Sequence, residues 1–220
     1  MSSDAEGDDL PERLHAGLVE LGLALTNAQQ CQLLDYLALL VQWNRVYNLT
    51  ALRDPAQMLT HHILDSLAVI APIRRYWGDR VQPARLLDVG SGGGLPGVVI
   101  AICQPEVAVT CVDAVAKKAA FIQQAAGALG LPNLTGRHAR VESLAGPFDL
   151  ITSRAFASLA DFTALSRGAL AEGGVWLAMK GKRPDAEIAS LSLPVEVFHV
   201  EPLTVPGLDA QRCLVWLRLH

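Results

Sequence analysis

The sequence predicts an α/β fold, in which a mostly parallel β-sheet follows a helical N-terminal segment. Three observations support this prediction. The spacing of apolar residues changes near Pro83 from a helical period to short strand-like runs that alternate with helical segments. A glycine-rich turn follows the first of these runs, as is typical where a strand leads into a ligand-binding helix. The last two runs have no helix between them, which ends the alternation.

The N-terminal segment, residues 10–82, is predicted to be a helical cap. Leucines recur on one helical face between Leu10 and Leu25. The sequence from Thr26 resembles a capping box and opens a second helix to about residue 47. A third helical stretch starts at Asp54, where an acidic N-cap is followed by proline, and a break is expected near residues 62–66.

Seven strands and four helices are predicted after residue 83. Short β-branched runs that alternate with helices indicate βαβ units and therefore parallel strands. The loop between the last two strands is too short for a parallel crossover, so this pair is predicted to be antiparallel. That ending is typical of the class I methyltransferase variant of the Rossmann sheet, which we expect over residues 83–220, packed with the cap as one structural unit. The expected strands are 85–90, 107–112, 134–138, 148–152, 174–179, 195–201 and 212–219, and the expected helices are 96–104, 116–129, 158–170 and 184–191.

Composition narrows the class of protein. With 220 residues, of which 51% are hydrophobic and 18% charged, the chain can bury one sizeable core, which excludes wholesale disorder. No apolar run is long enough for a membrane helix. The acidic residues 1–9, expected to be a disordered tail, lack the basic start of a signal peptide. We therefore expect a cytoplasmic monomer without a membrane partner. The cysteines, which lie among aliphatic residues, are expected to be reduced core thiols: Cys31, Cys103, Cys111 and Cys213.

The most informative motif runs from Asp88 to Gly97 and holds five glycines. Glycines let the backbone approach a ligand closely, and the helix N-terminus that follows offers free N–H groups. Gly92, Gly94 and Gly97 satisfy the dinucleotide fingerprint, which leaves an NAD-binding oxidoreductase or sensor as an alternative. The spacing from Asp88 resembles the S-adenosylmethionine signature, because a carboxylate suits the cationic amino group of methionine and would repel a pyrophosphate. The motif therefore favours S-adenosylmethionine, with Asp88, Gly90 and Gly92 as contacts.

Four further candidate site residues follow the second, third and fourth strands. Asp113 ends the second strand, where its carboxylate can accept hydrogen bonds from both ribose hydroxyls of a cofactor or can cap the next helix. Val141 and Glu142 follow the third strand, where this fold places groups around the adenine. Arg154 follows the fourth strand and is the candidate catalytic residue. Arg154 can hold the cofactor carboxylate or an RNA phosphate, or make a surface ion pair. The segment from Ser153 to Phe156 lacks the N/D-P-P-Y/F motif that many amine-modifying methyltransferases carry at this place.

Six motifs, in order from about Leu10 to Leu219, resemble those of the RsmG (GidB) family of bacterial methyltransferases. They are Trp43-Asn44 with Asn48-Leu49-Thr50, His61-His62 with Asp65-Ser66-Leu67, Asp88 to Gly97, Lys117-Lys118, Ser153 to Ala157, and Lys180-Gly181. The resemblance implies methylation of N7 of guanine 527 in 16S rRNA, with free rRNA, an assembly intermediate or the small ribosomal subunit as the partner. It also implies that S-adenosylmethionine is met at Gly90, Leu95, Val141, Glu142 and Arg154.

Methylation at guanine N7 is consistent with the lack of an evident general base. N7 has a free lone pair and needs no deprotonation before it attacks a sulfonium methyl, so positioning and electrostatics suffice. A-form RNA hides the N7 edge in a narrow groove, so the target base must lie in a loop or be flipped out. A small-molecule methyltransferase remains a second alternative. His61 and His62 are candidates for RNA contact, helix capping or packing, and no metal site is predicted.

Basic residues at the carboxyl ends of the predicted strands, or in the cap above them, form the candidate RNA-binding set. Five of the 22 acidic residues fall within the first 12 positions, so most of the net charge of −4 belongs to the tail. The rest of the chain is nearly neutral, and an RNA partner needs a local patch. A solvated scatter of bases is the alternative. The candidates are Arg45, Arg53, Lys117, Lys118, Arg154, Lys180, Lys182 and Arg183.

Overall fold

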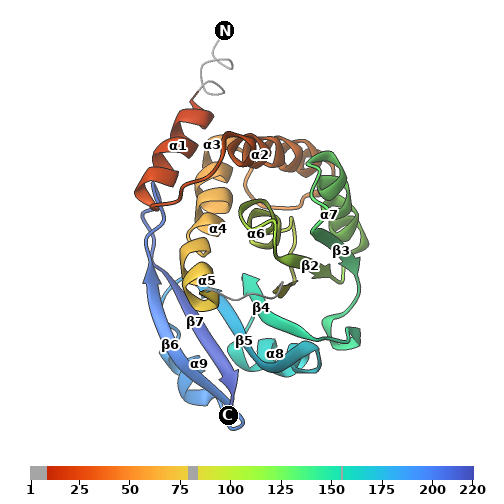
Figure 1. Cartoon of the computed structure of the whole chain (residues 1–220), viewed down its shortest axis with the longest axis vertical. Helices are drawn as coiled ribbons and strands as arrows, with labels where there is room; N and C mark the ends of the chain where they lie inside the picture. The colour runs from red at the N-terminus through yellow and green to blue at the C-terminus, as the bar shows by residue number, and fades with distance from the viewer. Residues whose placement is uncertain (1–8, 79–83, 155) are drawn as a thin grey trace.

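The computed structural model describes residues 9–78, 84–154 and 156–220. Of the predicted acidic tail, residues 1–8 lie outside the described part, and Asp9 directly precedes the first helix. Within these described ranges, six helical elements come before the sheet (Figure 1). They are α1 (Leu10–Glu20), α2 (Asn27–Tyr47), α3 (Pro55–Met58), the π-helical turn η1 (Leu59–Leu64), α4 (Asp65–Leu67) and α5 (Ile70–Trp77).

The cap helices begin where their capping residues predict. The Thr26 hydroxyl accepts the N–H of Gln29 at 3.2 Å, and the Gln29 side chain accepts the N–H of Thr26 at 3.0 Å, which completes the capping box. The Asp54 carboxylate accepts two N–H groups of the first turn of α3. The expected break is the π-helical turn η1, which begins slightly earlier than predicted. None of the helices in the described ranges is long and apolar enough to cross a membrane.

In the described part of the chain, seven strands form one sheet in the order β3-β2-β1-β4-β5-β7-β6. Strands β1 to β5 pair in parallel, and β7 runs antiparallel to both of its neighbours, β5 and β6. This confirms the predicted mostly parallel sheet with an antiparallel last strand. The strands are β1 (Arg85–Val89), β2 (Ala108–Asp113), β3 (Leu134–His138), β4 (Phe148–Arg154), β5 (Leu170–Lys180), β6 (Val195–Leu203) and β7 (Arg212–Leu219).

The connecting helices cover both faces of the sheet, as βαβ units require. They are α6 (Gly97–Cys103), α7 (Ala116–Ala128), the 3-10 turns η2 (Val141–Ser143) and η3 (Arg167–Ala169), α8 (Leu159–Ser166) and α9 (Asp185–Ser190). The helix predicted over 158–170 is shorter than expected. Its last turn is the 3-10 turn η3, and β5 then begins at Leu170 instead of residue 174, because Leu170 pairs with Phe148 across a register shift.

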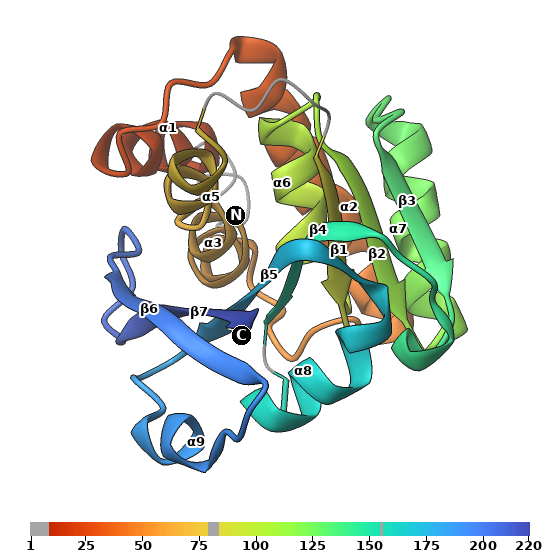
Figure 2. The same ribbon diagram turned by 60° about the horizontal axis from the view of Figure 1, so that its bottom comes forward.

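Two hydrophobic clusters lie between the sheet and the helices, one on each face of the sheet. Alternate residues of a strand point to opposite faces, so Leu86 joins one cluster and Leu87 the other. The first cluster packs the sheet against α6, α7 and the cap, and the second packs it against α8. Figure 2 shows α8 and α9 on the opposite side of the sheet from α5 and α6.

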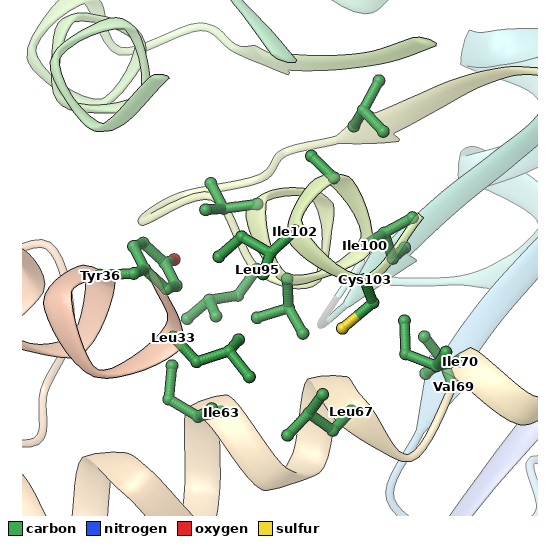
Figure 3. Packing of buried hydrophobic residues seen from close by; sticks show 14 of the residues in the cluster. Leu33, Tyr36, Ile63, Leu67, Val69, Ile70, Leu95, Ile100, Ile102 and Cys103 are labelled. Atoms are coloured by element: carbon green, nitrogen blue, oxygen red, sulfur yellow. The ribbon is translucent and has the colours of Figure 1, made fainter. Parts of the chain in front are cut away.

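The cap is packed on the sheet through the buried helix α6. Figure 3 shows Leu33 and Tyr36 of α2, together with Ile63 and Leu67, converging on this helix. Every residue of α6 is buried, so it has apolar neighbours on all sides. Three of the four cysteines are buried as predicted, but Cys31 is exposed. The prediction for Cys31 was wrong because its aliphatic neighbours in sequence lie on the other face of α2.

Candidate functional site

The glycine-rich loop between β1 and α6 is held by hydrogen bonds to two neighbouring elements, β2 and α2. The N–H of Gly90 donates to the carbonyl of Val112 in β2 at 2.9 Å. The N–H of Gly92 donates to Asp113 Oδ2 at 3.0 Å. The Tyr36 hydroxyl of α2 donates to the carbonyl of Gly93 at 2.5 Å. The loop shape is therefore fixed by β2 and by the cap, before any ligand binds.

Two glycines of the loop face open space. Gly90 and Gly92 have φ angles of +65° and +58°, which L side chains rarely adopt. A Cβ added at either position meets no heavy atom within 4 Å. At Gly97, by contrast, a Cβ would stand 2.3 Å from the sulfur of Cys111. Gly97 is thus required by packing, whereas Gly90 and Gly92 leave room for a ligand next to the backbone.

Asp88 lies beneath this loop, at the end of β1. Its side chain is fully buried, and Oδ2 accepts the N–H of Gly97 at 3.0 Å. Burial raises the pKa of Asp88 to about 7, against the lowering effects of the Gly97 N–H and the Arg154 charge. Its other oxygen, Oδ1, is buried and has no hydrogen-bond partner among the described residues. A buried acceptor without a donor is costly, so this atom suits a ligand that brings an N–H.

Asp113 stands at the end of β2 and serves both elements beside it. Oδ1 accepts the N–H of Val115, the residue just before α7, at 2.8 Å, and Oδ2 accepts the loop N–H of Gly92. Lys118 Nζ lies 3.8 Å from Oδ2. The N-cap role suggested by the sequence is not present, because the N-cap of α7 is Val115 and no side chain caps this helix. An ionised carboxylate has further lone pairs, which leaves acceptor capacity for ribose hydroxyls.

Three further cofactor candidates are Val141, Glu142 and Leu95. Val141 and Glu142 form η2, directly after β3; Val141 is buried and Glu142 exposed. Leu95 lies in the loop itself, and its side chain is buried in the core below the cap (Figure 3). A contact from Leu95 to a ligand therefore has to come from its backbone.

Arg154 ends β4 and reaches up to the cap. Its Nη1 donates to the carbonyl of His61 at 3.0 Å and to Asp65 Oδ2 at 3.2 Å. The neighbouring Ser153 hydroxyl donates to the carbonyl of Val89 at 2.8 Å, which ties this strand end to the start of the glycine loop. Of the three sequence interpretations, the structure contains an ion pair, but with a buried cap carboxylate instead of a surface acid.

The sequence motifs gave no role to Asp65, which the structure places between two arginines. Only 3% of its side chain is exposed. Oδ2 pairs with Arg154, and Oδ1 accepts the Nε–H of Arg212 at 2.8 Å. Arg212 was missed because it is the first residue of the last strand, far in sequence from every motif. The antiparallel direction of β7 brings it to the edge where β5 ends, since Cys213 pairs with Lys180.

A hydrogen-bonded chain within the cap explains the first two motifs of the resemblance. Asn44 donates to the carbonyl of Leu52 at 2.7 Å and accepts the N–H of Thr50 at 2.8 Å, which fixes the loop after α2. The Thr50 hydroxyl lies 2.7 Å from His62 Nε2, and His62 Nδ1 lies 3.5 Å from Arg154. Burial and the Arg154 charge lower the pKa of His62 to about 4, so this imidazole is neutral at pH 7.

A pocket of about 530 Å³ lies between the cap and the sheet edge, next to Asp65 and Arg154. Its lining joins the cap to the ends of β4 and β5 and the start of β7, through Leu52, His61, His62, Asp65, Arg154, Met179, Lys180, Gly181 and Arg212. A hollow of this size at the carboxyl ends of parallel strands is where open α/β sheets bind their ligands.

The structure divides the predicted RNA-binding set into separate groups. Lys117 is exposed at the start of α7, beside the ion pair between Lys118 and Asp113. Lys182 and Arg183 lie exposed after β5, and Arg183 pairs with Asp185.

Three members of the set are placed less favourably for phosphate contact. Lys180 is mostly covered and lies 2.9 Å from Glu187, which neutralises it. Arg45 lines a different hollow, between α1 and α2. Arg53 is exposed and donates to Asn48. In the described ranges no group of three or more His, Cys, Asp or Glu side chains is placed to hold a metal ion.

Comparison with known proteins agrees with this geometry. The family model described as rRNA small subunit methyltransferase G matches residues 29–215. The Ribosomal RNA small subunit methyltransferase G of Acidovorax sp. (strain JS42) is 69% identical over 211 residues, which are 93% of each chain.

Two solved structures share the fold at low sequence identity. TrmN from Thermus thermophilus has a TM-score of 0.54 and 19% identity, over 74% of this chain and 53% of that one. A SAM-dependent methyltransferase from Geobacter sulfurreducens, in complex with S-adenosyl-L-homocysteine, has a TM-score of 0.52 and 13% identity, over 71% of this chain and 90% of that one. The fold is thus that of class I methyltransferases. The family model and the 69% identical relative show that the chain belongs to the rRNA small subunit methyltransferase G family.

Proposed function

We propose that this protein transfers a methyl group from S-adenosylmethionine to N7 of guanine 527 in 16S rRNA. It acts as a cytoplasmic monomer on free rRNA, on an assembly intermediate or on the small ribosomal subunit. The observation that carries the proposal is the position of the cationic pocket around Arg154, one strand away from the open glycine loop. A cofactor on the loop and a nucleotide in the pocket then meet at the end of β4.

The residues at the loop fit S-adenosylmethionine. Gly90 and Gly92 leave open space along the backbone, and Asp88 Oδ1 is a buried acceptor that lacks a donor. The cationic amino group of the methionine portion satisfies both the charge and the hydrogen-bonding need of Asp88. Asp113 retains acceptor capacity for the ribose, and Val141 with Glu142 borders the adenine. When bound, the cofactor supplies an electrophilic methyl group.

The residues of the pocket fit a reaction that needs no general base. Guanine N7 attacks with its own lone pair, so the protein has to position the base and stabilise charge. His62 is held neutral by burial and lies within hydrogen-bonding distance of Thr50, and Arg154 forms an ion pair with Asp65. These groups orient a nucleotide, and none of them is poised to remove a proton near pH 7.

The direct test is a map of N7-methylguanosine in 16S rRNA. Small subunits from a strain that lacks the gene should carry no methyl group at guanine 527, and the purified protein with S-adenosylmethionine should restore it. Methylation at another guanine, or at another atom of the same base, overturns the proposed position. Thermal stabilisation by S-adenosylhomocysteine but not by NAD separates this function from that of a nicotinamide-dependent oxidoreductase or sensor.

A further inference from the structure

The pocket between the cap and the sheet edge carries one unbalanced positive charge. Asp65 neutralises one of its two arginines, Arg154 or Arg212, and leaves the charge of the other. Lys180 and Glu187 cancel each other at 2.9 Å. The pocket is therefore built for an anion, and its two arginine side chains, 22% and 24% exposed, are partly shielded from water, which strengthens their charge.

The two arginines have donors to spare, and Asp65 fixes where these point. Arg212 uses Nε for Asp65 and Nη1 for the carbonyl of Gln211, and its Nη2 has no partner in the described part of the chain. Arg154 uses Nη1 for the cap, and its Nη2 has only a long contact of 3.5 Å with His62. Guanidinium groups that are anchored on one side can present the other side to oxyanions.

A second hollow of about 310 Å³ continues from this pocket, with Gly181 and Arg212 in the walls of both. It is also basic, since Lys182 and Arg183 line it. A single carboxylate of a cofactor would occupy one of these spaces. Two adjoining basic hollows that share one arginine match an anion that repeats along a chain.

We propose that Arg212 binds a backbone phosphate of the target RNA strand, and that Asp65 is the positioning residue that holds Arg212 and Arg154 toward the pocket. The strand then crosses from the second hollow into the first, with the target nucleotide next to Arg154. This inference rests on the proposed function and names the residue pair that seats its substrate.

The test is Arg212→Gln, with Arg218→Gln as the matched control. Arg218 lies on the same strand but at its exposed far end, paired with Glu196. Arg212→Gln should raise KM for 16S rRNA about tenfold and leave the S-adenosylhomocysteine Kd within about twofold. It should also flatten the plot of log RNA affinity against log salt by somewhat less than one unit. Arg218→Gln should change none of these.

Two further variants separate charge from geometry. Arg212→Lys keeps the charge, so the salt slope should persist while KM rises. Asp65→Asn frees both arginines without removing positive charge. It should lower kcat severalfold while RNA affinity at low salt is kept or increased, a combination that simple loss of stability does not produce. Guanosine 5′-monophosphate should compete with RNA better than guanosine does in the wild type, and equally in Arg212→Gln.

Two results would overturn this inference. One is equal RNA affinity and salt slope for Arg212→Gln and Arg218→Gln. The other is a tenfold loss of S-adenosylhomocysteine affinity in Arg212→Gln, which would make the cofactor carboxylate the anion. The binding measurements do not depend on methyl transfer. If the wild type fails to methylate guanine N7 but Arg212→Gln still loses a phosphate contact, the proposed function fails and the anion site stands.

Discussion

A single buried carboxylate, Asp88, joins strand β1 to the end of the glycine loop through its hydrogen bond with the N–H of Gly97. Burial raises the pKa of Asp88 to about 7, which brings its ionisation into the neutral pH range. A carboxyl group whose pKa is raised on folding stabilises the fold fully below its ordinary pKa of 3.8. That contribution is lost as pH rises through 7. The protein therefore keeps this acid at a cost to its own stability, as is common at sites that serve a ligand.

Binding of S-adenosylhomocysteine should therefore depend on the protonation of Asp88. The amino group of the ligand favours the ionised carboxylate, so affinity should rise from pH 5 and level off above about pH 7, with proton release on the acid side. Titration calorimetry in buffers of different ionisation enthalpy measures that proton. Asp88→Asn should bind at least about tenfold more weakly at pH 8, a loss near 1.4 kcal/mol, and show no such pH dependence. If the affinity of Asp88→Asn for S-adenosylhomocysteine keeps the same pH dependence, the proton released on binding comes from another group.

The rate of methyl transfer should not depend on the ionisation of a histidine. His62 has a pKa of about 4, and attack by N7 releases no proton before the bond forms. The single-turnover rate at saturating cofactor and RNA should be flat between pH 6 and 8, both in the wild type and in His62→Gln. Rapid-quench measurement of methylated RNA checks this. An ionisation near pH 6 to 7 that disappears in His62→Gln would mean that a proton leaves the target, which excludes N7.

At the level of elements, helix α2 joins the cap to the cofactor loop. Tyr36 donates to Gly93 from a fully buried position, and Leu40 of the same helix packs against the loop at the same glycine. The sequence predicted helix α2, its capping box and the glycine loop, because each has a local signature. It did not predict that Tyr36 reaches the loop, because a tyrosine among leucines has the same period as the rest of a buried face.

Tyr36→Phe should loosen the glycine loop without unfolding the protein. The change leaves a buried carbonyl without its donor, which costs about 1–3 kcal/mol of unfolding free energy. Part of that cost should appear as a severalfold weaker S-adenosylhomocysteine affinity. Tyr47→Phe, on the exposed end of the same helix, is the control and should be neutral in both assays. If Tyr36→Phe loses stability but keeps full affinity, the cap does not set the loop for binding.

Leu40→Ala tests whether the cap and the sheet unfold together. Leu40 is fully buried beneath the loop, so its truncation should cost about 2–5 kcal/mol through lost burial and the cavity left behind. The loss should appear in one cooperative urea transition, by fluorescence and by circular dichroism alike, since the cap and the sheet share one core. Val46→Ala, exposed on the same helix, should be within about 0.5 kcal/mol of wild type. Two separate transitions would make the cap an independent domain.

At the scale of the whole molecule, local signals predicted the fold better than they predicted the site. The alternation of strands and helices and the short final loop were enough for the sheet and for its antiparallel last strand. The pairing of Asp65 with Arg154 and Arg212 depends on contacts between segments 89 and 147 residues apart. No spacing within the sequence encodes such contacts. They follow from the position of β7 beside β5, which only the assembled sheet defines.

RNA binding should come from a few local contacts, because the molecule as a whole carries no excess of positive charge. Lys117, Lys118, Lys182 and Arg183 are the candidates that flank the open loop and the basic hollows. If each contacts a phosphate, single replacement by glutamine should lower the salt slope of RNA affinity by somewhat less than one unit. The affinity for S-adenosylhomocysteine should stay within about twofold for Lys117, Lys182 and Arg183, whereas Lys118 also pairs with Asp113 at the proposed cofactor site.

Filter binding of a 16S rRNA fragment between 50 and 200 mM salt measures the slope. Arg75→Gln, at an exposed ion pair with Glu201, is the control and should leave it unchanged. Lys182 and Arg183 both line the second hollow, and replacing Lys182 should change the salt slope more. Arg183 is already paired with Asp185, so binding a phosphate would only replace that carboxylate. If all four variants keep the wild-type slope, the RNA lies elsewhere. Arg45, which lines the separate hollow between α1 and α2, is then the next residue to replace.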